Sequence, residues 1–506
     1  MLRFIDNYLD RITMYRLMLY FLIVLISAAA LLSFFGAVQY SPVSILGSTL
    51  FLITVCFITS KVFSLLLKAP TNFESSYITA LILTLIMHPA VSFDFLPILA
   101  LVGVLAISSK YILAIHKKHI FNPVAIAVVL LASATGTYAD WWGGEIQLLP
   151  LVILGGLLIM RKTRREHMLF CFFAIAMLTA VAIGLFNGAN MEQTVTTLLF
   201  HSALCYLGFI MFIEPLTTPP SKKLQLFYAS LVGVLFSSSA HIGDIYLTPE
   251  IALVIGNIFS YLVSPKQKLF LHLAQKIQVA PDIADFVFRQ SKKMTFLPGQ
   301  YMEWTLMHNP PDSRGERRYF TLASSPTEDT LRLGVKFYQN GSSFKKALAD
   351  ISAQTPIVAS QLSGEFVLPQ QKDRKLVFVA GGIGVTPYRS IVKYLLDNKE
   401  LRPIVILYAN KVADDIVYKD IFDQAERELA IKTVYSLTDR DHVPTDWKGR
   451  VGRIDAAMIA EEIPDWKERY FYLSGPHTMV TGYEDVLSKM GVPKKQMKTD
   501  FFPGYA

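Results

Sequence analysis

Long runs of apolar residues alternate with short polar connections over the first half of the chain. Several of these runs are shorter than the roughly 20 residues that a straight helix needs to cross a bilayer. We therefore expect some of them to be half-helices, or to be shielded from lipid by neighbouring helices. The pattern predicts a polytopic α-helical membrane domain of about ten spans. The predicted spans are residues 17–36, 43–66, 77–89, 95–115, 121–136, 147–160, 167–186, 195–213, 225–238 and 249–263.

The pattern changes after Pro265. Short β-rich runs separated by Gly, Pro and Asn come first, and from Lys375 strands alternate with helical stretches. The first pattern is typical of a small antiparallel β-barrel, and the second of a parallel sheet in an α/β domain. We expect three domains: a transmembrane domain at 1–265, a β-barrel domain at 266–370 and an α/β domain at 371–506.

The composition agrees with a membrane protein. The chain is 52% apolar and only 17% charged, against roughly 25% charged residues in an average soluble domain. The net charge of +8 does not indicate nucleic-acid binding. Much of the basic excess lies between the apolar runs, where it sets the orientation of the spans in the membrane.

Lysine and arginine occur in every second connection between the predicted spans. The positive-inside rule therefore places the amino terminus and everything after Pro265 in the cytoplasm, at a bacterial-type inner membrane. The alternation also supports ten spans, because a missed span would break it. The connections that contain neither residue are 37–42, 90–94, 137–146, 187–194 and 239–248.

The two groups of five predicted spans share proline-bounded ends. Spans three and eight end at 87–89 and 213–215, and spans five and ten begin at 121–123 and 247–249. Proline is favoured in the first turn of a helix and disfavoured in its interior, so these prolines mark helix ends. An odd number of spans in each group predicts an inverted repeat, in which short helices meet near the membrane midplane. The alternative is a chance match.

Several motifs in this half resemble a known family. They are residues 119–123, Trp141-Trp142, 148–156, Arg161-Lys162 and 214–219. Over most of residues 40–265 the chain resembles the membrane subunit shared by the sodium-pumping NADH:quinone reductase (NqrB) and the Rnf complex (RnfD). That family carries an FMN esterified to threonine in a Ser-Gly-Ala-Thr motif, which this chain lacks. The resemblance therefore implies a non-covalent FMN or riboflavin.

The three cysteines, Cys56, Cys171 and Cys205, lie far apart in apolar runs. Their spacing matches neither a zinc site nor an iron-sulfur site, so we expect buried packing residues and no metal. No plant-type ferredoxin module is expected.

A candidate flavin motif follows the first β-rich runs. Residues 296–301 precede the string Arg318-Tyr319-Phe320-Thr321. A flavin needs a cation for its phosphates, an aromatic face for its ring and a donor near N5. Arg318, Phe320 and Thr321 carry these groups in order, and alternate residues of a strand share one face. The motif resembles the Arg-x-Tyr-Ser/Thr strand of the ferredoxin-NADP reductase superfamily, which binds FAD, with Phe320 in place of tyrosine.

Further motifs of that superfamily follow in order. Residues 341–343 precede a helical run whose first amides suit a pyrophosphate. Residues 381–387 form a glycine turn between a buried strand and a helix, which suits a dinucleotide. Residues 407–410, which we expect after the next strand, residues 472–479 and an aromatic tail at 500–505 complete the set.

The resemblance implies roles for individual residues. Ser474 stands where the superfamily usually has a cysteine beside the nicotinamide. Asp439 favours the ribose of NADH over a 2′-phosphate, although Arg440 argues for NADPH. We expect Phe502 either to reach the flavin or to pack the last strand. The predicted catalytic residues are Thr321 and Ser474. The predicted cofactor-binding residues are Arg318, Tyr319, Phe320, Thr321, Leu322, Ser324, Lys336, Gly341, Ser342, Ser343, Gly381, Gly382, Ile383, Gly384, Thr386, Pro387, Tyr408, Asn410, Asp439, Gly475, Pro476, Met479 and Phe502.

Together these features predict a membrane-bound flavin oxidoreductase. Electrons would pass from cytosolic NAD(P)H through FAD, and through a membrane flavin, across the bilayer to quinone or to an extracytoplasmic flavoprotein. Glu214 and His201 are functional candidates because charge in lipid is costly, or else they serve helix ends and contacts. Two alternatives are a haem-dependent reductase of the ferric reductase and NADPH oxidase type, and a redox-coupled ion transporter.

Overall fold

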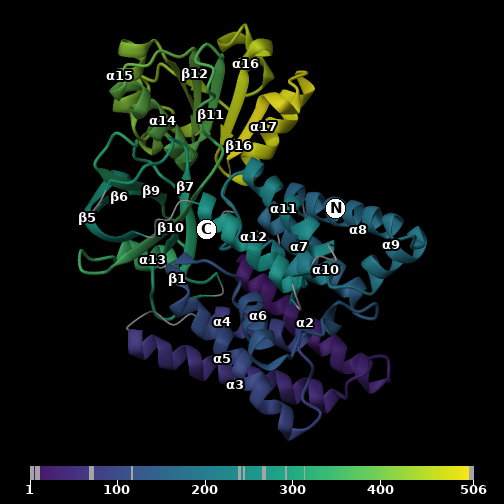
Figure 1. Ribbon diagram of the computed structural model, residues 1–506. Coiled ribbons are helices and arrows are strands. Elements are labelled where there is room, and N and C mark those ends of the chain that lie inside the picture. Colours follow the sequence, from purple (N-terminus) through teal and green to yellow (C-terminus); the bar gives the residue numbers. More distant parts are fainter. Residues whose placement is uncertain are drawn as a thin grey trace. The chain divides into compact units, whose positions relative to one another are not determined.

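The computed structural model describes residues 5, 9, 12–67, 73–115, 118–237, 241–242, 245–264, 269–290, 293–312 and 314–500. The chain divides into two compact units, Met1–Gln267 and Lys268–Ala506. The first unit is mainly helical, and the second holds two six-stranded sheets (Figure 1).

Each of the ten apolar runs of the first unit lies on helix. Proline occupies the first turn of several of these helices, where its fixed backbone angle is favourable. The helices are α2 (Met14–Phe34), α3 (Pro42–Leu67), α4 (Phe73–Ile86), α5 (Leu96–Ile112), α6 (Pro123–Thr135), α7 (Leu149–Thr163), α8 (Glu166–Phe186), α9 (Met191–Phe200), α10 (Leu204–Tyr206) with the π-helical η3 (Leu207–Phe212), α11 (Lys222–Ser237) and α12 (Pro249–Val263).

Four helical segments are long and apolar enough to cross a membrane, namely α2, α3, α8 and the segment Phe93–Ile112 that contains α5. Helix α9 and the α10–η3 segment make a fifth if they form one span bent by 49°. Helices α4, α6 and α12 are apolar but shorter. Within the described residues, helix length thus supports four or five full crossings. The prediction of ten is not confirmed.

Two stretches of the helical unit repeat the same order of elements. In each stretch a helix is followed by a two-stranded antiparallel hairpin and then by a short helix with proline in its first turn. The side chains of Asn122 and Thr248 cap these short helices, α6 and α12, which pack against each other. The first stretch is α5, β1 (Ala114–Ile115), β2 (Lys118–His119) and α6, and the second is α11, β3 (His241–Ile242), β4 (Ile245–Tyr246) and α12.

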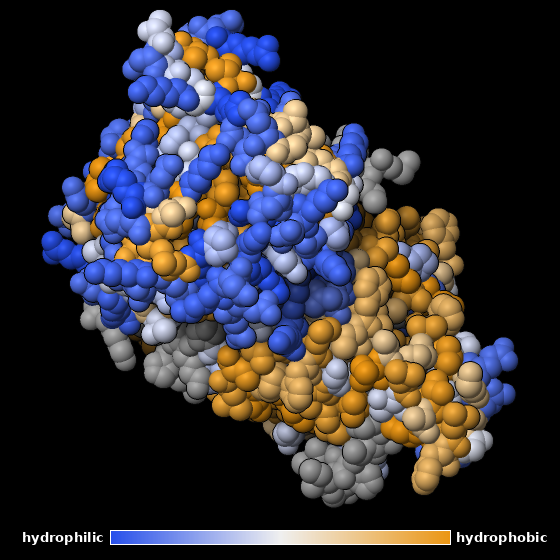
Figure 2. Space-filling model, turned by 90° about the horizontal axis from the view of Figure 1, so that it is seen from above, coloured by the Kyte–Doolittle hydropathy of each residue, from blue (hydrophilic) through white to orange (hydrophobic). Residues whose placement is uncertain are grey.

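The surface of the helical unit is rich in large apolar side chains (Figure 2). Phe34 and Phe186, for example, are 76% and 92% exposed. Contiguous apolar patches are uncommon on soluble proteins. A surface of this kind is suited to contact with lipid or with another apolar surface.

The first sheet of the second unit is antiparallel, with strand order β8-β7-β10-β5-β6-β9. Its core contains Phe286, Phe288 and Trp304, and the short helix α13 (Ser343–Ala349) adds Phe344. The strands are β5 (Leu269–Ala280), β6 (Ile283–Arg289), β7 (Tyr301–Thr305), β8 (Arg317–Thr321), β9 (Thr330–Lys336) and β10 (Ile357–Ser363).

The second sheet is parallel, with strand order β14-β13-β12-β11-β15-β16. Alternate residues of β11 pack into separate cores, Phe378 with α14 and α15 and Val379 with α16 and α17. The strands are β11 (Leu376–Gly381), β12 (Ile404–Asn410), β13 (Lys432–Leu437), β14 (Arg450–Val451), β15 (Tyr470–Ser474) and β16 (Met497–Asp500). The helices are α14 (Thr386–Asp397), α15 (Lys419–Leu429), α16 (Ala456–Glu462) and α17 (His477–Lys489).

One sequence expectation needs correction here. Residues 407–410 form the end of β12, whereas the sequence placed them after a strand. Strand pairing explains the difference, because Tyr408 lies opposite Ala380 and Asn410 lies opposite Leu437.

Candidate flavin and nicotinamide site

Strand β8 presents Arg318 and Phe320 on the face that meets α13. The Arg318 guanidinium lies 5.2 Å from the centre of the Phe344 ring, and the Phe320 ring lies 6.0 Å from it. Tyr319 points the other way and donates its hydroxyl hydrogen to Glu303 Oε2 at 3.0 Å. A cation and an aromatic ring are therefore held side by side, as a flavin nucleotide requires.

Thr321 ends β8 beside the last strand of the parallel sheet. Its hydroxyl donates to Asp500 Oδ2 at 3.5 Å, and Asp500 pairs with Ser474 across β16 and β15. All three side chains are buried. The Asp500 carboxylate thus contacts Thr321, and its backbone lies beside that of Ser474. From the sequence, Asp500 was expected only as the first residue of the tail 500–505, and its position at the end of a strand was the available signal.

The segment predicted to bind pyrophosphate begins α13. The Ser342 hydroxyl caps the helix by accepting the Lys345 N–H at 3.3 Å. The Ser343 N–H donates to Asp312 Oδ2 at 2.9 Å, so an internal carboxylate already uses one predicted amide. Burial raises the pKa of Asp312, but hydrogen bonds from Arg314 and Ser343 outweigh it and lower that pKa to about 2.

Three basic side chains, Arg314, Arg318 and Lys345, lie close together beside α13. Burial, together with the charges of Arg318 and Arg314, lowers the pKa of Lys345 to about 8. Mutual repulsion of this kind is relieved when a polyanion binds. Arg318 and Lys345, beside an aromatic face, fit the diphosphate and ring of FAD, while Arg314 is already paired with Asp312 at 2.7 Å. The predicted residue Lys336 instead pairs with Asp415 at 3.1 Å, and Leu322 is fully buried.

The glycine loop and the Ser474–Met479 segment meet at the centre of the parallel sheet. A Cβ atom at Gly384 would lie 2.5 Å from both Ser474 O and Gly475 Cα. A Cβ atom at Gly381 would lie 1.9 Å from the Met479 sulfur. Only glycine allows the backbone approach at Gly384, whereas at Gly381 the neighbour is the flexible end of the Met479 side chain. The chain leaves β11 toward β12 on one side and returns at β15 on the other, so both loops lie at a topological switch point, where open α/β sheets bind ligands.

The other predicted nucleotide residues lie at or near the same sheet edge. The side-chain amide of Asn410 is buried, and neither of its polar atoms has a hydrogen-bond partner in the described part of the chain. Such a group fits a dinucleotide ligand that would satisfy it. Tyr408, by contrast, is fully buried and packs against Phe422 and Tyr435.

Asp439 follows strand β13. It caps a short 3-10 turn by accepting the Asp441 N–H at 3.2 Å, and it lies 3.1 Å from His442. The hydrogen bond with His442 lowers the pKa of Asp439. Its charge favours NADH, whereas the exposed Arg440 that follows it would favour NADPH, so the choice of NADH stays a prediction. Phe502 lies outside the described residues.

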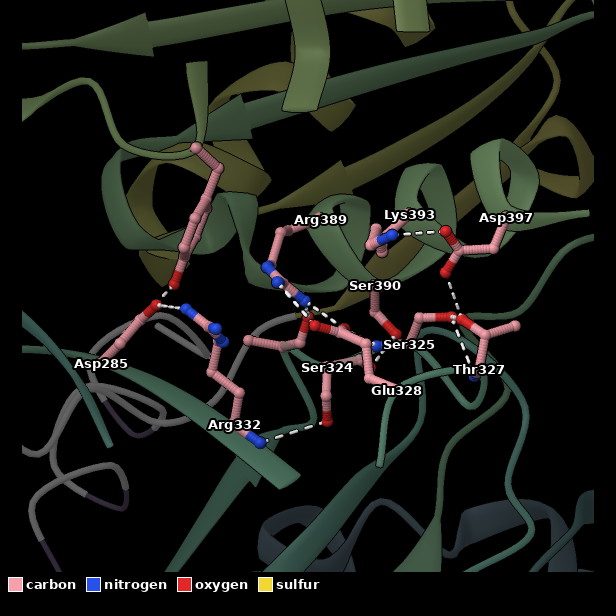
Figure 3. Close-up of polar contacts among 12 residues, drawn as sticks. Asp285, Ser324, Ser325, Thr327, Glu328, Arg332, Arg389, Ser390, Lys393 and Asp397 are labelled. Atoms are coloured by element: carbon pink, nitrogen blue, oxygen red, sulfur yellow. Dashed lines mark hydrogen bonds and ion pairs between the residues drawn. The ribbon is translucent and has the colours of Figure 1, made fainter. Parts of the chain in front are cut away.

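A polar cluster between the two sheets was not predicted from the sequence. It joins Ala323, Ser324 and Glu328, which follow strand β8 (the flavin strand), to Arg389 and Ser390 of helix α14 (Figure 3). Its members are far apart in the chain, so no local pattern reveals them.

Comparison with known proteins agrees with this geometry. Residues 378–485 match the family described as the oxidoreductase NAD-binding domain. A flavohemoprotein of Burkholderia sp. (strain TH2) is 26% identical over 234 residues, which cover 46% of this chain and 58% of that protein. NADH-cytochrome b5 reductase 1 of Mortierella alpina is 27% identical over 238 residues, which cover 46% and 78%. The second unit is an NAD(P)H-dependent, FAD-containing oxidoreductase module, similar to these reductases.

A solved structure is similar over the same half of the chain. The flavohem-like FAD/NAD-binding domain of nitric oxide dioxygenase from Vibrio cholerae O1 biovar El Tor has a TM-score of 0.40 and 19% identity. The match covers 46% of this chain and 97% of that domain.

Proposed function

We propose that this chain transfers electrons from cytosolic NADH through FAD, and through a non-covalent flavin of the helical unit, across the membrane. The acceptor is quinone or an extracytoplasmic flavoprotein. One observation carries the proposal: the same chain holds a reductase site at a switch point and a helical unit with an apolar surface.

The reductase site has a place for each part of the reaction. Arg318 and Phe320 bind the flavin. Within 341–343 the Gly341 and Ser343 N–H groups already donate to Tyr338 O and Asp312 Oδ2, so the pyrophosphate meets the Ser342 N–H there. Residues 381–387 and 474–479 hold the nicotinamide dinucleotide. When bound, FAD accepts a hydride from NADH and releases the two electrons singly. Thr321 and Ser474 orient the reacting rings and keep water from them, since both side chains are buried.

We assign residues 1–265 to an NqrB/RnfD-like membrane domain, 266–370 to the FAD domain and 371–506 to the NAD(P) domain. The repeated order of helix, hairpin and proline-capped helix supports an inverted repeat in the membrane domain. The loop charges support a cytoplasmic amino terminus and reductase unit.

Polar side chains of the helical unit bond to one another. His88 Nδ1 lies 2.5 Å from the Tyr40 hydroxyl, and His167 Nε2 lies 2.7 Å from Gln225. Each ring uses one of its two nitrogens in these contacts. Glu214 accepts a hydrogen bond from Asn122 Nδ2 at 2.8 Å, which suits a contact between helices. His201 is the exposed C-cap of α9.

Inside-out vesicles test the proposal. NADH added outside should reduce an impermeant acceptor trapped inside, and the purified protein should contain two flavins. No reduction of the trapped acceptor contradicts transmembrane electron transfer. A Soret band supports the haem alternative, and solute movement without acceptor reduction supports a transporter.

A further inference from the structure

Two partly buried ion pairs lie between the antiparallel and parallel sheets (Figure 3). The pair of Arg389 and Glu328 joins helix α14 to the loop that precedes β9, and the pair of Arg332 and Asp285 lies within the antiparallel sheet. Arg332 Nη1 of β9 lies 2.8 Å from Asp285 Oδ2 of β6. Arg389 of α14 donates to both carboxylate oxygens of Glu328, at 2.6 and 3.0 Å. The cluster holds two carboxylates and two guanidinium groups, so its charges balance. Burial raises the pKa of Glu328, but the bonds from Arg389 outweigh burial and lower it.

Tyr418 connects the two pairs. Its hydroxyl donates to Asp285 Oδ1 at 2.5 Å, and the Arg389 guanidinium lies 5.6 Å from the centre of its ring. Tyr418 precedes α15, a helix that packs on the parallel sheet, whereas Asp285 belongs to β6 of the antiparallel sheet. The cluster is therefore continuous from one sheet to the other.

Helix α14 also bonds directly to the backbone that follows the flavin strand. Arg389 Nη1 donates to Ala323 O at 2.7 Å, and the Ser390 hydroxyl donates to Ser324 O at 2.7 Å. These carbonyls follow Thr321 closely in the chain. Arg389 and Ser390 lie in the first turns of α14, directly after the glycine loop. One side of the proposed hydride-transfer site is thus bonded to the other.

We infer that Arg389 is a positioning residue for hydride transfer, which sets the separation between the glycine loop and the end of the flavin strand. The inference rests on the proposed function. The planar fork of arginine serves Glu328 and Ala323 together, which a lysine ammonium does not reproduce. Buried ion pairs contribute little net stability, because desolvation offsets their attraction, so orientation is their better-supported role here.

The test uses the full-length, FAD-loaded protein in detergent. Arg389→Met and Arg389→Lys are compared with Arg450→Met, which removes an Arg–Glu pair within the same α/β domain. Rapid mixing with NADH measures the flavin reduction rate, the NADH dissociation constant and the long-wavelength absorbance of the stacked nicotinamide–flavin complex. FAD content is measured separately.

Arg389→Met should slow flavin reduction about 10- to 100-fold, since a misplacement of about 1 Å has effects of that size. The long-wavelength band should weaken, while FAD content and the NADH dissociation constant stay within about three-fold of the wild type. Arg389→Lys should restore part of the rate and band. Arg450→Met should behave as the wild type.

Two results overturn the inference. One is an Arg389→Met protein that matches Arg450→Met. The other is a loss of rate that only follows a loss of FAD. If Arg389→Met does not fold, Ser390→Ala keeps both ion pairs and removes the bond to Ser324 O. It should slow reduction about 3- to 10-fold, and an unchanged rate and band overturn the inference. A wild-type flavin that NADH does not reduce instead overturns the proposed function, and the inference with it.

Discussion

The two units satisfy their buried polar groups in different ways. The reductase unit uses charge pairs, such as Arg389 with Glu328. The helical unit relies largely on uncharged groups. There the Asn122 N–H donates to Asn257 Oδ1 at 2.7 Å, and the Trp142 indole donates to Thr84 O at 2.9 Å. Charge in an apolar surrounding costs more than a neutral hydrogen bond, which explains the contrast.

The charge pairs of one unit and the uncharged hydrogen bonds of the other have different roles. In the reductase unit, an Arg–Glu pair joins helix α14 to the loop before β9, beside the candidate site. In the helical unit, a buried amide joins the start of α6 to the middle of α12, through Asn122 and Asn257. Changes in one unit should therefore affect flavin reduction, and changes in the other should affect helix packing and transmembrane transfer.

The largest effect is expected from Gly384→Ala. The added Cβ would lie 2.5 Å from backbone atoms of Ser474 and Gly475, so one of the two nicotinamide loops must move. NADH-dependent reduction of ferricyanide by the purified protein should fall on the order of 100-fold. The helical unit should be unaffected, as judged by its thermal unfolding. Gly482→Ala is the matched control, because a Cβ there meets open space. Equal activity of the two variants would contradict the assigned site.

Arg318→Ala should weaken FAD binding about 10- to 100-fold, in line with the loss of a hydrogen bond to a charged group. Extracted flavin should fall toward one per chain, because the proposed membrane flavin does not involve Arg318. The control is Arg317→Ala, whose side chain faces Glu303 at 3.7 Å. Loss of both flavins from Arg318→Ala would contradict independent flavin binding in the two units.

Asn257→Leu should destabilise the helical unit by about 1–3 kcal/mol, because the buried Asn122 N–H loses its acceptor. Thermal unfolding in detergent measures the shift. Ferricyanide reduction by NADH should stay at the wild-type rate, and transfer to the trapped acceptor should fall. Ser133→Ala removes an exposed hydroxyl from α6 and serves as control. A matching loss of ferricyanide reduction would contradict independent units.

The smallest effect is the pH dependence of FAD binding. Lys345 has a pKa of about 8 instead of its ordinary 10.5, so it loses its charge as the pH rises above 8. FAD affinity should then fall several-fold between pH 7 and pH 9.5, since one cation near the phosphates is neutralised. The FAD-free protein should gain stability over the same range, because the unfolded chain binds more protons than the folded one there. Lys345→Met should abolish both trends, and persistence of either would contradict the role of Lys345.

Sequence reasoning was most successful where the cause is local. The apolar runs predicted about ten spans, and helix is found at each run, although only four or five of the described segments are long enough to cross a membrane. The glycine turn at 381–387 was expected between a strand and a helix and lies between β11 and α14. Both features depend on residues within a few positions of one another, through hydrophobic periodicity and the conformational freedom of glycine.

Other expectations depended on packing. The number of full crossings could not be read from apolar runs, because a run such as 123–135 forms a helix too short to cross alone. The segment 341–343 was expected to offer its amides to pyrophosphate, but Asp312 already accepts one of them. Contacts with distant segments of the chain decide both how many helices cross fully and which amides are available to a ligand.

By itself, the sequence determined which residue types stand at each strand end and helix start, including Arg318, Thr321, Gly384 and Ser474. Only the tertiary structure decided that Gly384 touches Ser474 and that Thr321 reaches Asp500. It also decided that helix α14 is bonded to the end of the flavin strand. The physical reason is that local sterics act over a few residues, whereas strand order and burial choose partners from distant parts of the chain.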